Sequence, residues 1–274
     1  YKEKLNKTGN PAIDYAKSVI SGKTVACEFV KHSCRRFLSD LMREDIYFDL
    51  KAAKKALKFI ELQRHTKGEW KGELFIIQPW QKFIVYNIFG FYKREGIRRF
   101  TKAYIEVPKK NGKSPLAAAI ANYFFYESLH EAPELFSVAT ELGQARIAWQ
   151  YSYDMLKSFT AEYEISDEFN FSDSINNAEI KHIEGGFYKP LAFDEKAKKD
   201  GFSVTFGLVD EYHAHKADSM YNILKDGMAA RKSPLLLAIT TAGDNIYSPC
   251  YIHRKYCVSI LDGTLKDDSL FTII

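Results

Sequence analysis

The segment 107–114 reads Val-Pro-Lys-Lys-Asn-Gly-Lys-Ser, and its residue types suit the binding of a phosphate chain. Backbone N–H groups of such a loop, and of the helix after it, donate hydrogen bonds to phosphate oxygens. A lysine at Lys113 reaches the β- and γ-phosphates, and a hydroxyl at Ser114 binds Mg²⁺. The usual pattern has glycine where Val107 stands. The predicted nucleotide-binding residues of the loop are Lys110, Asn111, Gly112, Lys113 and Ser114.

The segments around this loop predict the elements that position it. Residues 100–107 alternate apolar and polar side chains, which is typical of a strand. Residues 115–129 are rich in alanine and leucine and begin with a proline, which a first helical turn accepts. A second Gly-Lys-Thr, at residues 22–24, follows a helical pattern at 12–20 instead of a strand. We therefore predict a phosphate site at the first loop only.

Two further groups of polar residues end predicted strands. Asp210 and Glu211 follow the strand at 202–209, and Thr240 and Thr241 follow the strand at 235–239. In a parallel sheet, ligands bind beyond the carboxyl ends of the strands. Asp210 can hold a magnesium ion, and Glu211 can act as general base on an attacking water. The threonines can contact the γ-phosphate and transmit a change along their strand.

Structural interpretations of the same residues stay open. An Asp-Glu pair is ordinary at an exposed strand-to-loop junction, and threonines cap buried strands. A glutamine in Gln78-Pro79-Trp80-Gln81 can pair with an adenine edge, or it can cap a helix beside a core tryptophan. His213 and His215 follow the acidic pair as His-x-His, which without partner ligands is more often a loop feature, and neither is assigned a role.

The rest of the chain predicts an α/β fold. Strands alternating with helices indicate a mostly parallel sheet flanked by helices, here preceded by an N-terminal helical subdomain. Residues 178–193 alternate around Gly185-Gly186 and predict a hairpin. We predict a helical subdomain at 1–70, a nucleotide-binding core at 71–245 and a lid or linker at 246–274. Helices are predicted at 11–20, 26–42, 49–63, 83–91 and 144–159, and a further strand at 135–139.

Composition limits the class of protein. With 274 residues, 46% hydrophobic and 27% charged, the chain can bury a large core and is not disordered. The formal net charge is +4, so any DNA contact has to come from local patches. Lysines and arginines gather in 51–58 and 93–102, where solvated faces are the favoured interpretation. No apolar run is long enough to span a membrane.

Cysteine usage fits a reducing cytoplasm better than a disulfide scaffold, since the chain has four cysteines. Two sets of cysteines and a histidine have the residue types of zinc ligands. Neither set contains a Cys-x-x-Cys pair, so a structural zinc site is not predicted. The two sets are Cys27, His32 and Cys34, and Cys250, His253 and Cys257.

Three motifs together resemble the ATPase domain of the large terminase subunit of tailed bacteriophages. They are residues 109–114, residues 208–213 (Leu-Val-Asp-Glu-Tyr-His) and residues 239–243 (Ile-Thr-Thr-Ala-Gly). Residues 19–41 and 78–90 also resemble upstream segments of that family. The resemblance implies a P-loop NTPase fold of the RecA/ASCE type. It also implies an ATPase that moves double-stranded DNA into an empty procapsid.

The resemblance implies cofactors, partners and location as well. The cofactors would be ATP and Mg²⁺. The partners would be double-stranded DNA, the portal protein, a small terminase subunit and further copies of the chain in a ring, usually of five. The chain would act in the host cell cytoplasm and transiently at the procapsid portal, with no membrane.

The same resemblance assigns roles to individual residues. Lys113 and Ser114 would contact the nucleotide, Asp210 the magnesium ion, and Glu211 would be the catalytic carboxylate. The coupling motif would consist of Thr240, Thr241 and Ala242. Gln81 would lie on the adenine side of the nucleotide.

The chain departs from the family at one site residue. Lys109 stands where the family often has a catalytic arginine, and lysine lacks the bidentate fork of arginine. A basic residue from a neighbouring subunit is also expected, and the sequence does not choose among the candidates. They are Arg146, Lys196, Lys198, Lys199 and Arg231.

Alternatives from other classes stay open. A helicase or recombination ATPase would share the loop and the Asp-Glu pair, but would add arginine-bearing motifs and a second motor domain. A GTPase would carry Asn-Lys-x-Asp, which the sequence lacks. A weakly catalytic structural module of a packaging complex is the third possibility. Large terminases usually add a nuclease domain after the ATPase, and from these residues we expect no nuclease activity.

Overall fold

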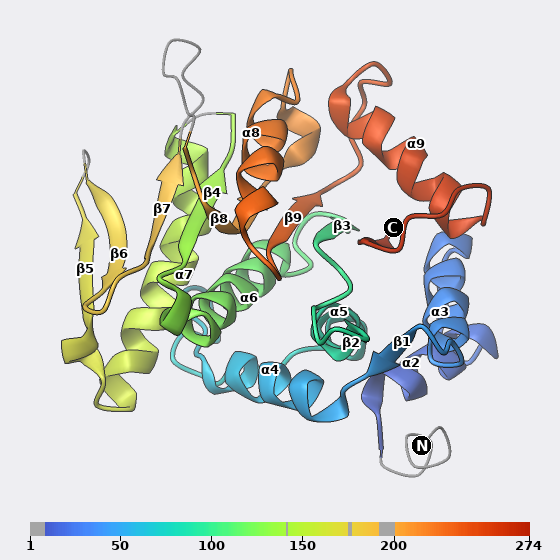
Figure 1. Cartoon of the computed structure of the whole chain (residues 1–274), viewed down its shortest axis with the longest axis horizontal. Coiled ribbons are helices and arrows are strands. Elements are labelled where there is room, and N and C mark those ends of the chain that lie inside the picture. The colour runs from blue at the N-terminus through green and yellow to red at the C-terminus, as the bar shows by residue number, and fades with distance from the viewer. Residues whose placement is uncertain (1–8, 141, 175–176, 192–200) are drawn as a thin grey trace. The chain divides into compact units, whose positions relative to one another are not determined.

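The chain folds into two compact units, each built from segments far apart in sequence (Figure 1). The computed structural model describes residues 9–140, 142–174, 177–191 and 201–274. The first unit comprises the described residues of Tyr1–Phe59, Ile76–Ile105 and His253–Ile274. The second comprises those of Ile60–Phe75 and Glu106–Ile252. The predicted division at residues 70 and 245 stays a prediction.

Strands of the second unit follow one another in the order β9-β8-β4-β7-β6-β5. β8 is parallel to β4 and β9, and β7 is parallel to β4, whereas β6 is antiparallel to both β5 and β7. Every residue of β8 and β9 is buried, as expected for strands covered on both faces. The predicted mostly parallel sheet is confirmed. The bounds are β4 Glu134–Val138, β5 Phe169–Asp173, β6 Ala178–His182, β7 Phe187–Leu191, β8 Val204–Val209 and β9 Leu235–Thr240.

Helices cover both faces of this sheet. Successive residues of a strand point to opposite faces. The ring of Phe206 packs against Phe124 of α6, with ring centroids 5.1 Å apart. A Cβ on the next residue, Gly207, would lie 3.0 Å from Leu224 of α8, so α8 lies on the opposite face. α7 packs beside α6. The bounds are α6 Lys113–Glu127, α7 Leu142–Glu162 and α8 Ser219–Gly227.

The first unit is mainly helical. Its two strand pairs are the antiparallel β1 and β2 and the parallel β3 and β10. The pair β1–β2 was not predicted. Its helices are α2 Pro11–Ile20, α3 Glu28–Asp40, α5 Pro79–Gly90, and most of α4 Leu50–Leu62 and α9 Pro249–Leu261. Its strands are β1 Ile46–Phe48, β2 Phe91–Lys93, β3 Lys102–Glu106 and β10 Leu270–Ile273.

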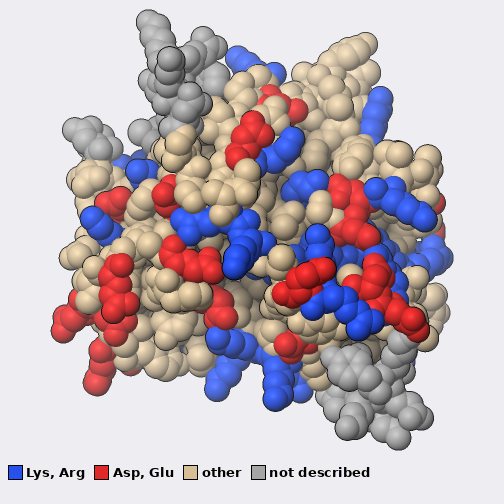
Figure 2. Space-filling view, viewed as in Figure 1, with Lys and Arg blue, Asp and Glu red and all other residues tan. Residues whose placement is uncertain are grey.

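The surface carries both signs of charge. Lysines and arginines are interspersed with aspartates and glutamates over much of the face in Figure 2, in keeping with the small net charge. Among the helices that the structure describes, none combines the length and apolar character needed to cross a bilayer.

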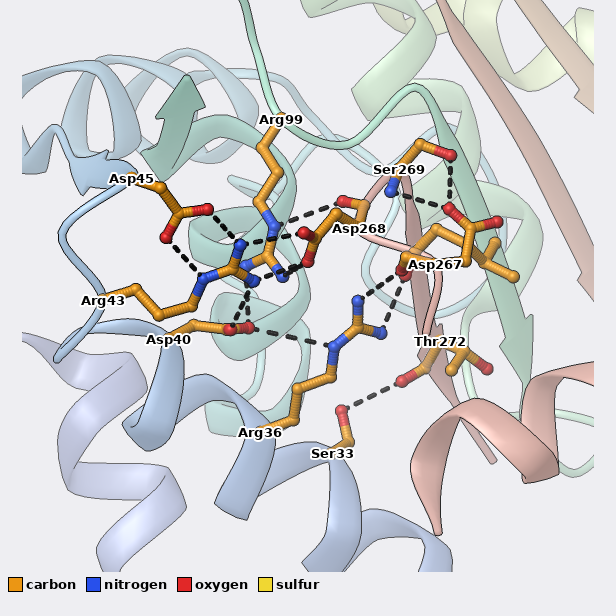
Figure 3. Close-up of polar contacts among 11 residues, drawn as sticks. Ser33, Arg36, Asp40, Arg43, Asp45, Arg99, Asp267, Asp268, Ser269 and Thr272 are labelled. Carbon is orange, nitrogen blue, oxygen red and sulfur yellow. Dashed lines mark hydrogen bonds and ion pairs between the residues drawn. The ribbon is translucent and has the colours of Figure 1, made fainter. Parts of the chain in front are cut away.

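An ion-pair cluster in the first unit joins the end of α3 to the turn before β10 (Figure 3). Arg99 is 1% exposed, and its guanidinium lies 2.7 Å from Oδ2 of Asp40 and 2.9 Å from Oδ1 of Asp268. Arg43 donates to the carboxylates of Asp45 and Asp268. Each carboxylate in this cluster therefore faces at least one guanidinium.

Candidate nucleotide-binding site

The loop between β3 and α6 has the backbone of a tight anion-binding turn. Gly112 adopts φ 72° and Lys110 φ 66°, both left-handed. Glycine adopts this conformation without penalty, but for Lys110 it carries strain of the kind found at functional sites. The amide of Asn111 folds back and donates to the carbonyls of Pro108 and Lys109, at 3.2 and 3.1 Å. These two hydrogen bonds stabilise the turn.

Helix α6 begins at Lys113, immediately after the loop. The first N–H groups of a helix have no partner within it, so they are available to an anion in the loop. Lys113 is only 7% exposed. Lys109 and Lys110 are exposed on the loop. The loop therefore combines free N–H groups with one enclosed lysine and two exposed ones.

Asp210 directly follows β8 and lies beside the start of α6. It is buried, and burial together with the neighbouring Glu211 carboxylate raises its pKa to about 6. The Lys113 ammonium and a hydrogen bond with the Ser114 side chain oppose this rise in pKa without cancelling it. The structure thus brings together Lys113, Ser114 and Asp210, which the sequence places in separate motifs.

Glu211 is held in an unusual backbone conformation. Its φ of 46° and ψ of 49° are left-handed, and its N–H donates to Oδ1 of Asp210 at 2.9 Å. A hydroxyl and a carboxylate are hard oxygen ligands of the kind Mg²⁺ prefers. Asp210 is buried with an elevated pKa, and a cation beside it would relieve the cost of its ionisation. The residues present therefore fit a magnesium ion at Ser114 and Asp210.

The end of β9 is hydrogen-bonded to the phosphate loop. The carbonyl of Thr240 accepts the N–H of Val107 at 3.0 Å. The hydroxyl of Thr240 donates to the carbonyl of Thr241 at 2.8 Å, and both threonines are buried. Ala242 follows them and is exposed. The predicted coupling residues therefore reach from the sheet interior to its surface, in direct contact with the loop.

Gln81 is not among the residues assembled here. It belongs to the first unit, where its Oε1 accepts the N–H of Gln78 at 2.8 Å and caps α5. Trp80 is half-buried rather than part of the core. An adenine contact by Gln81 stays a prediction. The second Gly-Lys-Thr lies in the turn after helix α2, as expected from the sequence pattern.

Of the five basic residues that could act at the site of a neighbouring copy, the structure describes two, Arg231 and Arg146. Arg231 donates to the carbonyls of Glu131, Ala132 and Ser203, which lie just before β4 and β8. Arg231 therefore lies at the amino ends of these strands, whereas the phosphate loop of its own chain lies at the carboxyl end of β9. Arg146 of α7 donates to the carbonyls at the end of β5. Lys196, Lys198 and Lys199 lie outside the described residues.

The two histidines without a sequence-based role both contact the site. Nε2 of His215 lies 3.2 Å from the carbonyl of Asp210, and burial lowers the pKa of this buried imidazole. His213 donates its backbone N–H to the hydroxyl of Thr240 at 3.0 Å. The signal that points to them is their closeness in sequence to the acidic pair. Only the fold shows that His213 reaches the end of β9, whereas His215 contacts the residue after β8.

Comparisons with known proteins bear on the family and the fold of the chain. A model of the family described as Terminase large subunit, ATPase domain matches residues 79–259. The crystal structure of the bacteriophage HK97 large terminase is similar, with a TM-score of 0.61 at 18% identity, over 81% of this chain and 43% of that chain. At this identity the likeness establishes the fold.

Two further relatives overlap with smaller parts of the chain. Protein YmfN of Escherichia coli strain K12 is 48% identical over 75 residues, which is 27% of this chain and 16% of that protein. The large terminase of a thermophilic bacteriophage in complex with ADP has a TM-score of 0.43 at 12% identity, over 64% of this chain and 40% of that chain. The chain spans less than half the length of each of the three relatives.

Proposed function

We propose that this chain, which belongs to the family of terminase large subunit ATPase domains, hydrolyses ATP to drive double-stranded DNA into an empty procapsid. The observation that carries the proposal is the meeting of three sequence motifs at one sheet edge. The lysine and serine of the loop lie against Asp210, and Glu211 follows it. A phosphate cradle, a metal site and a base are the parts that phosphoryl transfer to water needs.

Each residue has a proposed role in that chemistry. The loop N–H groups and Lys113 bind the phosphates, and Lys110, Asn111 and Gly112 shape the loop. Ser114 and Asp210 hold Mg²⁺, which neutralises charge on the phosphates when bound. Glu211 accepts a proton from the attacking water. We assign Lys109 to the transferred phosphate, since it is exposed on the loop.

The proposed partners follow from the family. They are double-stranded DNA, the portal protein, a small terminase subunit and a ring of copies, with five as the expected number. The site of action would be the host cytoplasm, transiently at the portal. A basic group from a neighbouring copy would complete the site, and such groups are worth about 10³–10⁵ in rate. Slow turnover by the single chain is therefore expected.

The experiment that tests this proposal is nucleotide binding rather than turnover. A non-hydrolysable ATP analogue with Mg²⁺ is titrated by calorimetry into the chain and into Lys113→Ala. We expect binding by the wild type that is weakened at least 10-fold in the variant. Lys71→Ala, at an exposed lysine outside the loop, is the control and should bind like the wild type. Absence of binding by a folded wild type would favour a structural module instead.

A further inference from the structure

A polar path runs from the phosphate loop to Glu211 through His213. The carbonyl of Thr240 accepts the N–H of Val107, and the hydroxyl of Thr240 accepts the N–H of His213. Nδ1 of His213 lies 3.1 Å from the same hydroxyl oxygen and 3.3 Å from Oε2 of Glu211. One imidazole therefore contacts both the end of β9 and the proposed catalytic carboxylate.

Hydrogen-bond directions along this path indicate which imidazole nitrogen carries the proton. Thr240 donates its single hydroxyl proton to the carbonyl of Thr241. Its oxygen is then an acceptor for His213, and the 3.1 Å contact is a hydrogen bond in the tautomer with a proton on Nδ1; the Thr241 hydroxyl lies farther from the same nitrogen, at 3.5 Å. That proton lies on the side of the imidazole that faces Oε2 of Glu211. The single Nδ1–H is therefore shared between the Thr240 hydroxyl and Oε2 of Glu211, or turns from one to the other.

Glu211 has room for such a donor. Its Oε2 is buried and has no hydrogen-bond partner within the described residues, and the His213 contact has the distance of an ion pair without hydrogen-bond geometry. A buried carboxylate oxygen without a donor is costly, so a small rotation that completes the bond is favourable. Gly243 leaves space for the ring, since a Cβ there would lie 3.0 Å from Cβ of His213.

We propose that His213 is a positioning residue that orients the carboxylate of Glu211 and ties it to Thr240. This inference rests on the proposed ATPase function. His213 contacts neither the phosphate loop nor Ser114 in the described contacts, so it acts on the water-activating carboxylate and not on nucleotide affinity. A displacement of the loop that moved Thr240 would also move His213, and with it the carboxylate.

Replacement of His213 by asparagine and by glutamine separates a positioning role from an effect of side-chain size. The amide nitrogen of asparagine can occupy the place of Nδ1, whereas that of glutamine takes the place of Nε2. Single-turnover ATP hydrolysis, with enzyme in excess and Mg²⁺ present, measures even slow rates. We expect His213→Ala and His213→Gln to lower the rate at least 10-fold. His213→Asn should retain most of it, and nucleotide Kd should change less than 3-fold in all three.

The control is His130→Ala, at an exposed histidine after α6, which should match the wild type. Circular dichroism and urea midpoints establish that each variant is folded. Equal rates for wild type and His213→Ala would overturn the inference while leaving the ATPase intact. Equal losses for asparagine and glutamine would also overturn it. Failure of the wild type to bind nucleotide would instead remove the proposed function.

A second, independent observation concerns α4. Lys51, Lys54, Lys55 and Lys58 are exposed, and their spacing of i, i+3, i+4 and i+7 puts them on one helix face. The opposite face is buried in the core. α4 contains a single acidic residue, Glu61, close to its end. In Figure 2, blue Lys or Arg side chains gather where Figure 1 draws α4. We call the four residues the lysine stripe.

The geometry points to the lysine stripe as a contact for the phosphate backbone of double-stranded DNA. The stripe is about 10 Å long at 1.5 Å per residue. One DNA strand carries a phosphate about every 3.4 Å along the axis, so the stripe can face about three phosphates in a row. Surface helices ordinarily mix both signs of charge, and a one-sign row on a rigid helix is complementary to a regular polyanion.

Salt dependence tests this contact. A short random-sequence duplex is titrated into the wild type and into a variant with all four stripe lysines changed to glutamine, across a series of salt concentrations. Each phosphate contact contributes about 0.9 to the slope of log K against log salt. We expect the variant to bind at least 10-fold more weakly at low salt, with the slope reduced by about 2 to 4.

A matched control keeps the total charge of the two variants equal. It carries the same change at four exposed lysines of the second unit, Lys71, Lys181, Lys225 and Lys232. The control should keep most of the slope. An equal loss in both variants would show dependence on net charge alone and overturn the assignment, as would an unchanged slope in the stripe variant. Nucleotide binding by calorimetry should stay unchanged in both.

Discussion

Two acidic clusters of this chain, each with a buried carboxylate, differ in how their charge is balanced. In the first unit, hydrogen bonds from Arg43 lower the pKa of Asp268 well below its usual range, and the Arg99 guanidinium adds to this. In the second unit, burial and Glu211 raise the pKa of Asp210 to about 6. Both clusters contain nearly inaccessible carboxylates, since Asp40 is 6% and Asp210 5% exposed.

The difference separates a structural cluster from a functional one. The first cluster supplies its own cations, Arg43 from the turn after α3 and Arg99 from the segment before β3, so its carboxylates are paired within the fold. The second has one enclosed lysine against two adjacent carboxylates. Carboxylates whose charge is not compensated by the fold mark sites that await a proton or a metal ion. The imbalance at Asp210 and Glu211 is therefore what a magnesium–nucleotide site requires.

The largest expected effect breaks the chemistry of the second cluster without disturbing its fold. Glu211→Gln keeps the shape of the side chain but cannot accept a proton. We expect single-turnover ATP hydrolysis to fall by about 10²–10⁴, the range for loss of a general base, with nucleotide affinity retained. The rate is measured beside that of Glu184→Gln, at an exposed glutamate in the β6–β7 turn. A Glu211→Gln rate within a factor of about two of the wild type would remove the assignment of the base.

Sequence reasoning reached the second cluster because its parts are local. Lys113 and Ser114 follow a strand and open a helix, and Asp210 and Glu211 directly follow a buried strand. Parallel strands bring such ends to one edge, so the meeting of these residues is predictable before any coordinates. The contact of His213 with Thr240 was not predictable, because it depends on the left-handed turn at Glu211.

The first cluster could not be predicted at all. Arg99 and Asp268 are 169 residues apart, and no periodicity links them. The strands β1 and β2 were missed for a related reason, since three residues are too few to show a period. The same limit applies to Gln81, whose spacing fits both an adenine contact and the helix cap that the structure shows.

A second prediction breaks the balance of the first cluster. Arg99→Ala leaves the carboxylate of Asp40 buried with less compensation, and the loss of one partner of a buried pair costs about 3–5 kcal/mol. Urea unfolding should show a midpoint lower by a corresponding amount. Arg35→Ala is the control and should leave the midpoint unchanged. The Arg35 side chain is half-exposed, and its Nη1 lies 3.9 Å from Oε2 of Glu28. Similar midpoints for both variants would contradict the view that this cluster supports the fold.

The smallest expected effect is on the pH dependence of stability, which should differ between the two clusters. The pKa of Asp210 is raised in the folded chain, so the unfolded chain loses that proton first as pH rises from about 4. Stability is therefore lost between about pH 4 and 6, and the loss stays constant above. A change of pKa from 3.8 to about 6 is worth at most about 3 kcal/mol. Asp210→Asn should recover part of it at neutral pH.

The contribution of Asp268 to stability changes with pH in the opposite direction to that of Asp210. Because its pKa is lowered, its contribution to stability is present at neutral pH and is lost as pH falls below about 4. Urea midpoints of the wild type, Asp210→Asn and Asp268→Asn, measured without Mg²⁺ from about pH 3 to 8 at constant ionic strength, compare the two signs. Asp210→Asn should gain on the wild type up to about pH 6, whereas the deficit of Asp268→Asn should shrink below about pH 4. Parallel curves for all three proteins would show that the two clusters do not differ in charge balance.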